Sequence, residues 1–263
     1  MPDIDTSTFH MVQLWLGARR LMALGRMLKL PLHRVDTNYL VHCALGELFQ
    51  DQALKPFCIE DGPASLNGAA PNGRHVRVLG YANVDREALE NIARGFASPT
   101  VYEICDWARC ASKPMPDTFP AGMRLAFELR ACPVVRKASA GEGPDGQRWT
   151  KGQELDAFLS EAWERPNDTL DREAVYRDWL ARHLDARGGA RVETVGMERF
   201  SIERMTRRVP KNGTRKAVAL QRPDVTLTGT LTVTDADAFA ALLRSGIGRH
   251  KSFGFGMLKV RRV

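Results

Sequence analysis

The chain has 263 residues, 44% of them hydrophobic and 26% charged, which is enough for a folded protein of two domains. Its 38 Lys and Arg exceed its 31 Asp and Glu, so the net charge of +7 favours an anionic partner. No apolar run reaches the ~18 residues of a membrane span, and the first residues are polar, so we expect no membrane contact and no secretory signal. The five cysteines form no Cys-x-x-Cys pair, so we expect a reduced, cytoplasmic protein without a zinc site.

The first half alternates strand-like and helix-like patterns. Periodicity predicts strands and helices in the order strand 9–16, helix 36–50, strand 74–81, helix 84–94 and strand 100–107. Three prolines within 112–120 then predict a linker, which places the first domain at 1–117 and the second at 118–263.

The second half repeats the alternation. Its predicted elements are strand 123–131, helix 170–186, strands 198–208 and 217–233, helix 235–244 and strand 255–260. The residues 137–166 are predicted to be a loop-rich insertion, and the sequence predicts no function for it. Both halves are compatible with the order β-α-β-β-α-β, which predicts an α+β fold of tandem ferredoxin-like, RRM-like domains. Neither half has the aromatic signature of an ordinary RRM, so base stacking on a sheet face is not expected.

An arginine-rich segment at 15–31 is predicted to be a short helix that stops at Pro31. Leu21, Leu24 and Leu28 share one face, and the opposite face carries Arg19, Arg26 and Lys29. Such a cationic stripe suits a phosphate backbone, with His33 and Arg34 in the following connection. An ordinary solvated helix face explains the same pattern.

The helix at 36–50 carries the residues best suited to proton transfer. Asp36 or Thr37 is its expected N-cap, and a broad apolar arc is expected to pack on a sheet. Tyr39 and His42 lie at spacing i,i+3 on another side, where a phenol and an imidazole meet. Gly46 leaves space beside them. A His–Tyr hydrogen bond without chemistry is the alternative interpretation.

A basic hairpin is predicted at 204–216, turning at Asn212-Gly213. It contains six cations and no acid: Arg204, Arg207, Arg208, Lys211, Arg215 and Lys216. A ribbon of this kind binds a nucleic-acid groove or backbone, and for RNA it would sense shape more than base edges. A charged, solvent-exposed hairpin is the alternative.

The most informative segment is the glycine-rich stretch after the last predicted helix. Gly246, Gly248, Gly254 and Gly256 surround the consecutive residues Arg249, His250 and Lys251. Glycines at positive φ let backbone amides approach a phosphate. The segment leaves a helix C-terminus and leads into a strand, whereas nucleotide-binding glycine loops run from strand to helix. The order therefore favours a polyanion backbone over a mononucleotide, and a glycine-capped helix with a tight turn is the alternative.

Together these motifs resemble the CRISPR-associated repeat-processing endoribonucleases of the RAMP superfamily, most closely the CasE-like type of type I-E systems. The stretch 246–258 is similar to that family's signature glycine-rich loop, with Lys251-Ser252 before Gly-x-Gly. Asp36-x-x-Tyr39-x-x-His42 is similar to its first helix, and 129–137 to the strand that opens its second domain.

The resemblance implies metal-free cleavage of precursor CRISPR RNA within repeats, with no cofactor. The RNA 2′-hydroxyl would attack the adjacent phosphate, leaving a 2′,3′-cyclic phosphate and a 5′-hydroxyl, and the protein would keep the crRNA stem-loop and join other subunits of an effector complex. Tyr39, His42, Arg26 and Arg34 are the expected catalytic residues. The expected RNA contacts are Arg19, Arg20, Lys29, His33, Arg136, Lys137, Arg204, Arg207, Arg208, Lys211, Arg215, Lys216, Gly248, Arg249, His250, Lys251 and Ser252.

Two features depart from the family pattern: a polar N-terminal extension and the arginine-rich insertion at 19–34. They indicate a divergent branch of the family, such as a type IV relative. In such a branch, arginines would take over part of the catalytic role expected of His42. Two other hypotheses stay open: a non-catalytic crRNA-binding subunit and a DNA-binding regulator.

Overall fold

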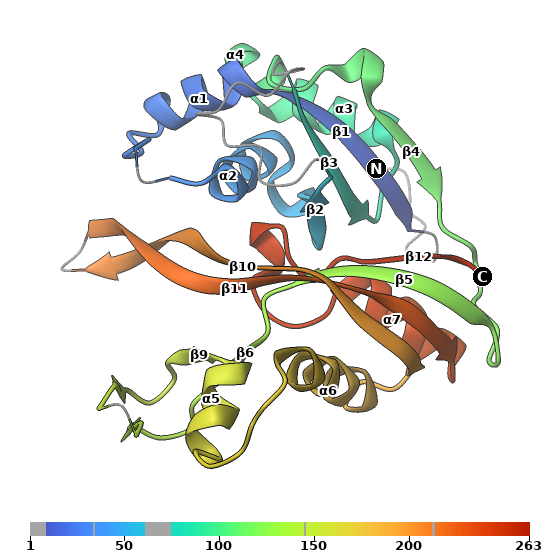
Figure 1. Ribbon diagram of the computed structural model, residues 1–263. Helices are drawn as coiled ribbons and strands as arrows, with labels where there is room; N and C mark the ends of the chain where they lie inside the picture. Colours follow the sequence, from blue (N-terminus) through green and yellow to red (C-terminus); the bar gives the residue numbers. More distant parts are fainter. Residues whose placement is uncertain (1–8, 34, 61–74, 145, 212–213) are drawn as a thin grey trace.

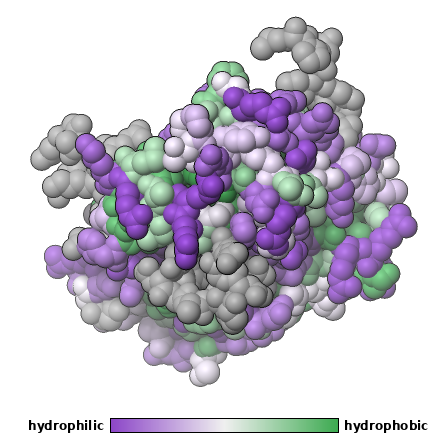
Figure 2. Space-filling model, turned by 90° about the horizontal axis from the view of Figure 1, so that it is seen from above, coloured by the Kyte–Doolittle hydropathy of each residue, from purple (hydrophilic) through white to green (hydrophobic). Residues whose placement is uncertain are grey.

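The computed structural model describes residues 9–33, 35–60, 75–144, 146–211 and 214–263. Two antiparallel four-stranded sheets lie one above the other, with helices on their outer faces (Figure 1). The outer face of the first half is mostly hydrophilic, with small apolar patches between the polar side chains (Figure 2). Within the described residues, no helix is both long and apolar enough to cross a membrane.

The first sheet has the strand order of a ferredoxin-like unit, β2-β3-β1-β4. Its strands are β1 His10–Gly17, β2 Phe57–Ile59, β3 His75–Ala82 and β4 Ala111–Pro114. The helices of this half are α1 Ala18–Met27, α2 Thr37–Phe49 and α3 Arg86–Phe96, followed by the short α4 Pro99–Tyr102; the 3₁₀ turns are η1 Gln50–Gln52 and η2 Trp107–Arg109.

The second sheet repeats this order as β10-β11-β5-β12. Its strands are β5 Arg124–Ala131, β10 Ala190–Lys211, β11 Thr214–Val233 and β12 Leu258–Arg262, and its helices are α6 Arg172–Asp185 and α7 Ala236–Ser245. The insertion forms β6 Val134–Arg136, β7 Gly141–Glu142, β8 Arg148–Trp149, β9 Glu154–Asp156 and α5 Ala157–Glu164. The tandem ferredoxin-like prediction is therefore confirmed, while the exact domain boundary stays a prediction.

One predicted strand is wrong. Residues 100–107 lie in α4, the following turn and the start of η2. The edge strand is β4, which overlaps the start of the stretch interpreted as a linker. Pro99 takes the first position of α4, where its missing N–H costs nothing. Val101, Ile104 and Cys105 are buried at helical spacing. Proline is tolerated in an edge strand, so Pro114 misled the sequence interpretation.

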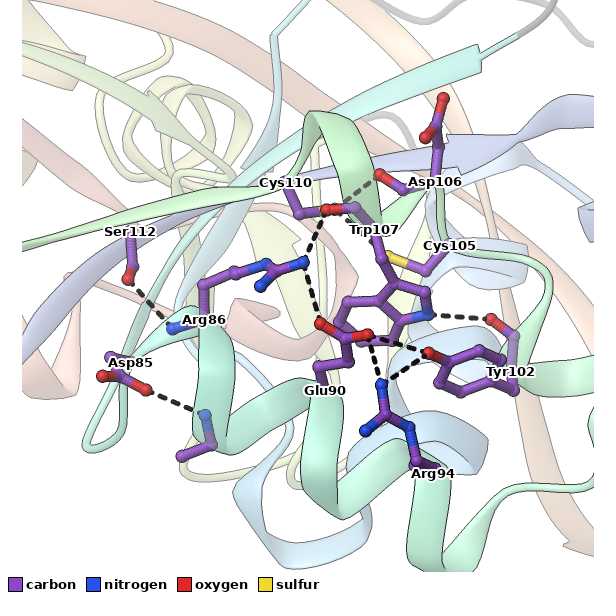
Figure 3. A network of polar contacts seen from close by, with 11 residues as sticks. Asp85, Arg86, Glu90, Arg94, Tyr102, Cys105, Asp106, Trp107, Cys110 and Ser112 are labelled. Carbon is purple, nitrogen blue, oxygen red and sulfur yellow. Dashed lines mark hydrogen bonds and ion pairs between the residues drawn. The ribbon is translucent and has the colours of Figure 1, made fainter.

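Polar contacts fix this irregular stretch to α3 (Figure 3). One carboxylate oxygen of Glu90 accepts hydrogen bonds from Arg94 and Tyr102 at 2.8 and 2.9 Å. Its other oxygen pairs with Arg86 at 2.8 Å, and Trp107 donates to the carbonyl of Tyr102 at 3.2 Å. These contacts hold the segment between α3 and β4, whose only regular elements are the short α4 and η2.

The two halves share apolar packing. Cys58 and Tyr81 of the first sheet belong to the same buried cluster as Met257 and Leu258 of the second half. The Tyr81 hydroxyl donates to the Leu258 carbonyl at 2.8 Å, and burial raises the pKa of the Cys58 thiol to about 12. Residues just before β12 are therefore fixed against β2 and β3.

The stretch 246–257 between α7 and β12, called the glycine segment below, folds back on itself. Its four glycines all have positive φ, between 68° and 83°. Ile247 N–H donates to the Gly256 carbonyl at 2.8 Å, and Gly256 N–H donates to the Arg130 carbonyl at 2.8 Å. A Cβ at position 256 would lie 2.3 Å from the Ile247 carbonyl oxygen, so this close return requires glycine.

Two glycine substitutions are expected to change stability in opposite directions. Gly256→Ala adds both a clash and left-handed strain of about 1–3 kcal/mol, so the Tm should fall by about 3 °C or more. Gly46→Ala adds a methyl group with nothing within 4 Å on an exposed turn of α2. It should stabilise the protein by about 0.5–1 kcal/mol. Thermal unfolding of both variants checks this, and equal effects would contradict it.

Candidate functional site

Helix α2 carries Tyr39 and His42, while its other side packs in the core of the first half. The Asp36 side chain caps the helix by accepting from Tyr39 N–H at 2.8 Å, as expected from the sequence. The predicted apolar arc is buried throughout: Val41, Ala44, Leu45, Leu48 and Phe49. Tyr39 is buried as well, and His42 is half-buried. The ring centroids of Tyr39 and His42 are 5.9 Å apart.

The glycine segment supplies the third ring of this site. Its 3₁₀ turn η3, Lys251–Phe253, places Phe253 against α2. The Phe253 ring stacks on Tyr39 with centroids 6.1 Å apart, and it lies 4.8 Å from the ring of His42. Residues near the two ends of the chain thus form one aromatic group.

The surroundings of His42 favour its neutral form. Burial lowers the pKa of His42 below its ordinary value, and the positive charge of Lys55 lowers it further. A neutral imidazole near pH 7 can accept a proton, which is the property required of a general base.

Lys55, which acts on His42, also acts on Lys251 of the glycine segment, so cations from both halves lie near one another. Burial lowers the pKa of Lys251, and the charges of Arg187 and Lys55 lower it further. Arg187 follows α6 and donates to the Gly246 carbonyl at 2.8 Å, which ties it to the start of the glycine segment. Each charge acting on the pKa of His42 or Lys251 is positive, so an anion placed there would relieve mutual repulsion.

Two residues next to Lys251 in the glycine segment bind a carboxylate of the insertion. Arg249 and His250 both bind the carboxylate of Glu154 on β9, His250 at 2.8 Å. These contacts lower the pKa of Glu154 to about 2, although burial alone would raise it. Gly248 lies against Trp179, because a Cβ there would be 2.8 Å from the indole ring. Ser252 is half-buried in η3.

The arginine-rich helix lies beside α2. Helix α1 ends at Met27, earlier than the expected stop at Pro31. The predicted cations Arg19, Arg20, Arg26 and Lys29 are exposed, as is His33. Arg20 is paired with Glu103. Arg34 lies outside the described residues, and among the contacts of the described residues none joins a cation of α1 to His42.

The basic hairpin forms as predicted, as a long two-stranded ribbon. Strands β10 and β11 pair from Ala190↔Val233 to Lys211↔Thr214. The ribbon reaches beyond the second sheet on the side of α1 and α2 (Figure 1). Arg204 is exposed. The side chains of Arg207, Arg208, Lys211, Arg215 and Lys216 lie outside the described part of the structure, as do Asn212 and Gly213 of the predicted turn.

Two further predicted RNA contacts lie at the start of the insertion. Arg136 is exposed and donates to the Gly152 carbonyl at 3.2 Å. Lys137 donates to Ser160 at 2.8 Å and pairs with Glu164 at 3.2 Å. The Lys137 charge is therefore partly used inside the insertion. Among the described residues, no group of three His, Cys, Asp or Glu gathers in a way that could hold a metal ion.

Sequence reasoning missed Lys55, Arg187 and the ring of Phe253. Lys55 lies between η1 and β2 and belongs to no cluster of cations in the sequence. Arg187 follows α6, for which the sequence predicts only an amphipathic helix. Phe253 was within the glycine-rich motif, so the pattern contained it without indicating its partner. Only the fold brings Lys55 and Phe253 to His42 and Arg187 to Lys251.

Comparisons with known proteins agree with this architecture. A solved structure of the CRISPR endoribonuclease Cse3 bound to a 19-nucleotide RNA is 21% identical with a TM-score of 0.56, covering 96% of this chain and 99% of that one. Cse3 of Thermus thermophilus, bound to an RNA representing a pre-cleavage complex, is 20% identical (TM-score 0.55; 97% and 99% covered). Cas6e of Escherichia coli K-12 is 22% identical (TM-score 0.54; 97% and 100% covered).

At these identities the likeness to the solved structures concerns the fold. No curated protein matches the sequence. The family model described as "CRISPR associated protein" matches residues 10–262. Because this match runs along nearly the whole chain, it confirms the family resemblance seen in the sequence: the chain belongs to the CRISPR-associated proteins.

Proposed function

We propose that this chain is an endoribonuclease that cleaves precursor CRISPR RNA within its repeats without a metal ion, and that it keeps the stem-loop of the product. Family membership and the fold of the RNA-bound Cse3 structures support this proposal. The observation that carries it is the half-buried His42, whose pKa is lowered, beside Phe253 and Lys55, with Lys251 close enough to Lys55 for their charges to interact.

The reaction needs two proton transfers and one exchange of bonds at phosphorus. Neutral His42 accepts the proton of the RNA 2′-hydroxyl, and the 2′-oxygen attacks the adjacent phosphorus. The bond from phosphorus to the 5′-oxygen breaks, and that oxygen receives a proton. The products are a 2′,3′-cyclic phosphate and a 5′-hydroxyl. Tyr39, stacked on Phe253, is the candidate for the second proton transfer. Such proton transfer contributes about 10²–10⁴ in rate.

Negative charge grows on the phosphate as the 2′-oxygen attacks. Lys55 and Lys251 approach from different halves of the chain and are suited to stabilise that charge. Arg26 and Arg34 stay candidates for the same role. The cations of α1, the ribbon and the insertion are proposed to hold the RNA backbone, through contacts that weaken as salt increases.

The product complex is proposed to act in the cytoplasm as part of a larger CRISPR effector assembly. The alternative, a non-catalytic crRNA-binding subunit, would use the same ribbon and glycine segment. A pure binder has no need of a histidine held neutral beside a cationic group, and this favours the enzyme.

The first test concerns the chemistry. Repeat RNA incubated with the protein in EDTA should be cleaved to a 2′,3′-cyclic phosphate and a 5′-hydroxyl, as mass spectrometry of the fragments would show. A single 2′-deoxy substitution at the cleavage position should abolish cleavage, while the same substitution one nucleotide away should not. A metal requirement, or cleavage without the 2′-hydroxyl, contradicts the mechanism. Tight binding without any cleavage favours the non-catalytic subunit, and preference for duplex DNA favours the regulator.

The second test concerns His42. His42→Ala should slow single-turnover cleavage at least ~100-fold because the proton acceptor is lost, and the RNA dissociation constant should stay unchanged. His75→Ala is a matched control, since His75 lies at the start of β3 near Asp106. If His42→Ala cleaves at nearly the wild-type rate while Arg26→Ala or Arg34→Ala is inactive, the arginine-rich segment carries the catalysis.

The third test uses pH. Because burial and Lys55 lower the pKa of His42 from 6.5, the neutral base persists to lower pH than in a free imidazole. The acid limb of kcat/KM, which reports the free enzyme, should therefore have its midpoint below 6.5. Lys55→Ala removes one positive neighbour and should raise that midpoint. A wild-type midpoint above 6.5 would assign the proton transfer to another group.

A further inference from the structure

Asp36 uses its two carboxylate oxygens for two different parts of the molecule. One oxygen accepts from Tyr39 N–H at 2.8 Å and caps α2. The other accepts from Thr206 N–H on β10 at 2.6 Å, although the two residues are 170 positions apart. Strand β10 is at the edge of its sheet, so an outward backbone N–H there needs a partner outside the sheet. A charged acceptor makes this hydrogen bond stronger than an ordinary one.

The junction lies where the ribbon leaves the body of the protein. Thr206 is buried and pairs with Ala219 across the ribbon. Its neighbour Met205 belongs to a buried cluster with Phe255, against which Phe253 also packs. Beyond Thr206, β10 continues to Lys211 and the ribbon returns from Thr214. The orientation of the basic ribbon is thus set within a few residues of the aromatic site.

A second tie supports the same turn of α2. The side-chain oxygen of Asn38 accepts from Arg130 at 3.2 Å. Arg130 on β5 is held by Asp224 on β11 at 2.6 Å. Both Asp36 and Asn38 therefore connect the first turn of α2 to the second sheet. Asp36 is the residue that reaches the ribbon itself.

We propose that Asp36 is a positioning residue that couples the RNA-holding ribbon to the helix carrying Tyr39 and His42. This inference rests on the proposed function. RNA bound along the ribbon is placed relative to His42 by the carboxylate between them. A reacting group displaced by 1 Å loses about 100-fold in rate, so a change in this junction should reduce cleavage more than binding.

The test uses variants that keep the helix cap and lose the second acceptor. Asn and Ser cap helices about as well as Asp. Asp36→Asn retains one acceptor for Tyr39 N–H but turns an amide donor toward Thr206 N–H, and Asp36→Ser is too short to reach both. Asp85→Asn is the matched control, because Asp85 caps α3 with the same 2.8 Å bond from an exposed position.

Three measurements decide the inference: single-turnover cleavage at saturating repeat RNA, the RNA dissociation constant, and thermal unfolding. Asp36→Asn and Asp36→Ser should cleave about 10–100-fold more slowly. Their dissociation constants should stay close to that of Asp85→Asn, and their Tm should be lower, because the buried Thr206 N–H loses its acceptor. Wild-type cleavage rates in both Asp36 variants, with wild-type protein active, overturn the positioning role and leave the proposed function standing.

Amide hydrogen exchange gives a readout that does not depend on cleavage. RNA binding should slow exchange at 37–42 in the wild-type protein and in Asp85→Asn. In the Asp36 variants the same RNA should leave the exchange of 37–42 unchanged, because the ribbon no longer acts on α2. Equal protection in all proteins overturns the coupling even if the chain only binds RNA. A wild-type chain that neither binds nor cleaves repeat RNA overturns the proposed function and this inference together.

Discussion

The buried ion pair between Arg130 and Asp224 is the interaction on which the site depends. Asp224 is fully buried and receives three hydrogen bonds from the Arg130 guanidinium, at 2.6, 3.0 and 3.2 Å. The same guanidinium lies 4.8 Å from the ring centre of Phe255 and donates to Asn38. The Arg130 carbonyl accepts from Gly256. Removing the carboxylate of such a buried pair typically costs about 3–5 kcal/mol, because the buried arginine is left without a counter-charge. One arginine on β5 therefore holds both the glycine segment and the first turn of α2.

The distribution of partners separates the structural charges from those available to a ligand. Arg130, Arg172 and Lys259 are each paired with buried or half-buried carboxylates. Among the contacts between described residues, Lys55 and Lys251 have no carboxylate partner. Neighbouring cations without an acid repel one another, which lowers the stability of the protein without ligand. Functional sites commonly contain charges without a partner of opposite sign, at a cost in the stability of the protein. The repulsion between Lys55 and Lys251 is therefore a sign of function.

Much of the fold could be predicted from the sequence because each half repeats one pattern of periodicity. The helix at 36–50 and the strand at 123–131 have clear apolar spacing, and both were correct within two residues. The strand predicted at 100–107 was wrong because the helical spacing of Val101, Ile104 and Cys105 extends over one turn only, which is too short to distinguish a helix from a strand in the sequence. For the site, the ring pair Tyr39 and His42 was visible as helical spacing. The convergence of Lys55 and Arg187 was not, because only tertiary packing joins isolated cations from different elements.

The insertion at 137–166, which the sequence left without a role, explains how the glycine segment keeps its shape. His250 adopts a left-handed conformation with φ of 61°, which is costly for a residue with a side chain. Glu154 on β9 holds its imidazole at 2.8 Å and also holds Arg249. With these two side chains bound to the insertion, the next residues form η3 and direct Phe253 toward His42. Three carboxylates, Asp36, Glu154 and Asp224, therefore arrange the elements around the site. Because these carboxylates pair with other groups, the positive charges of Lys55 and Lys251 stay available to a phosphate backbone.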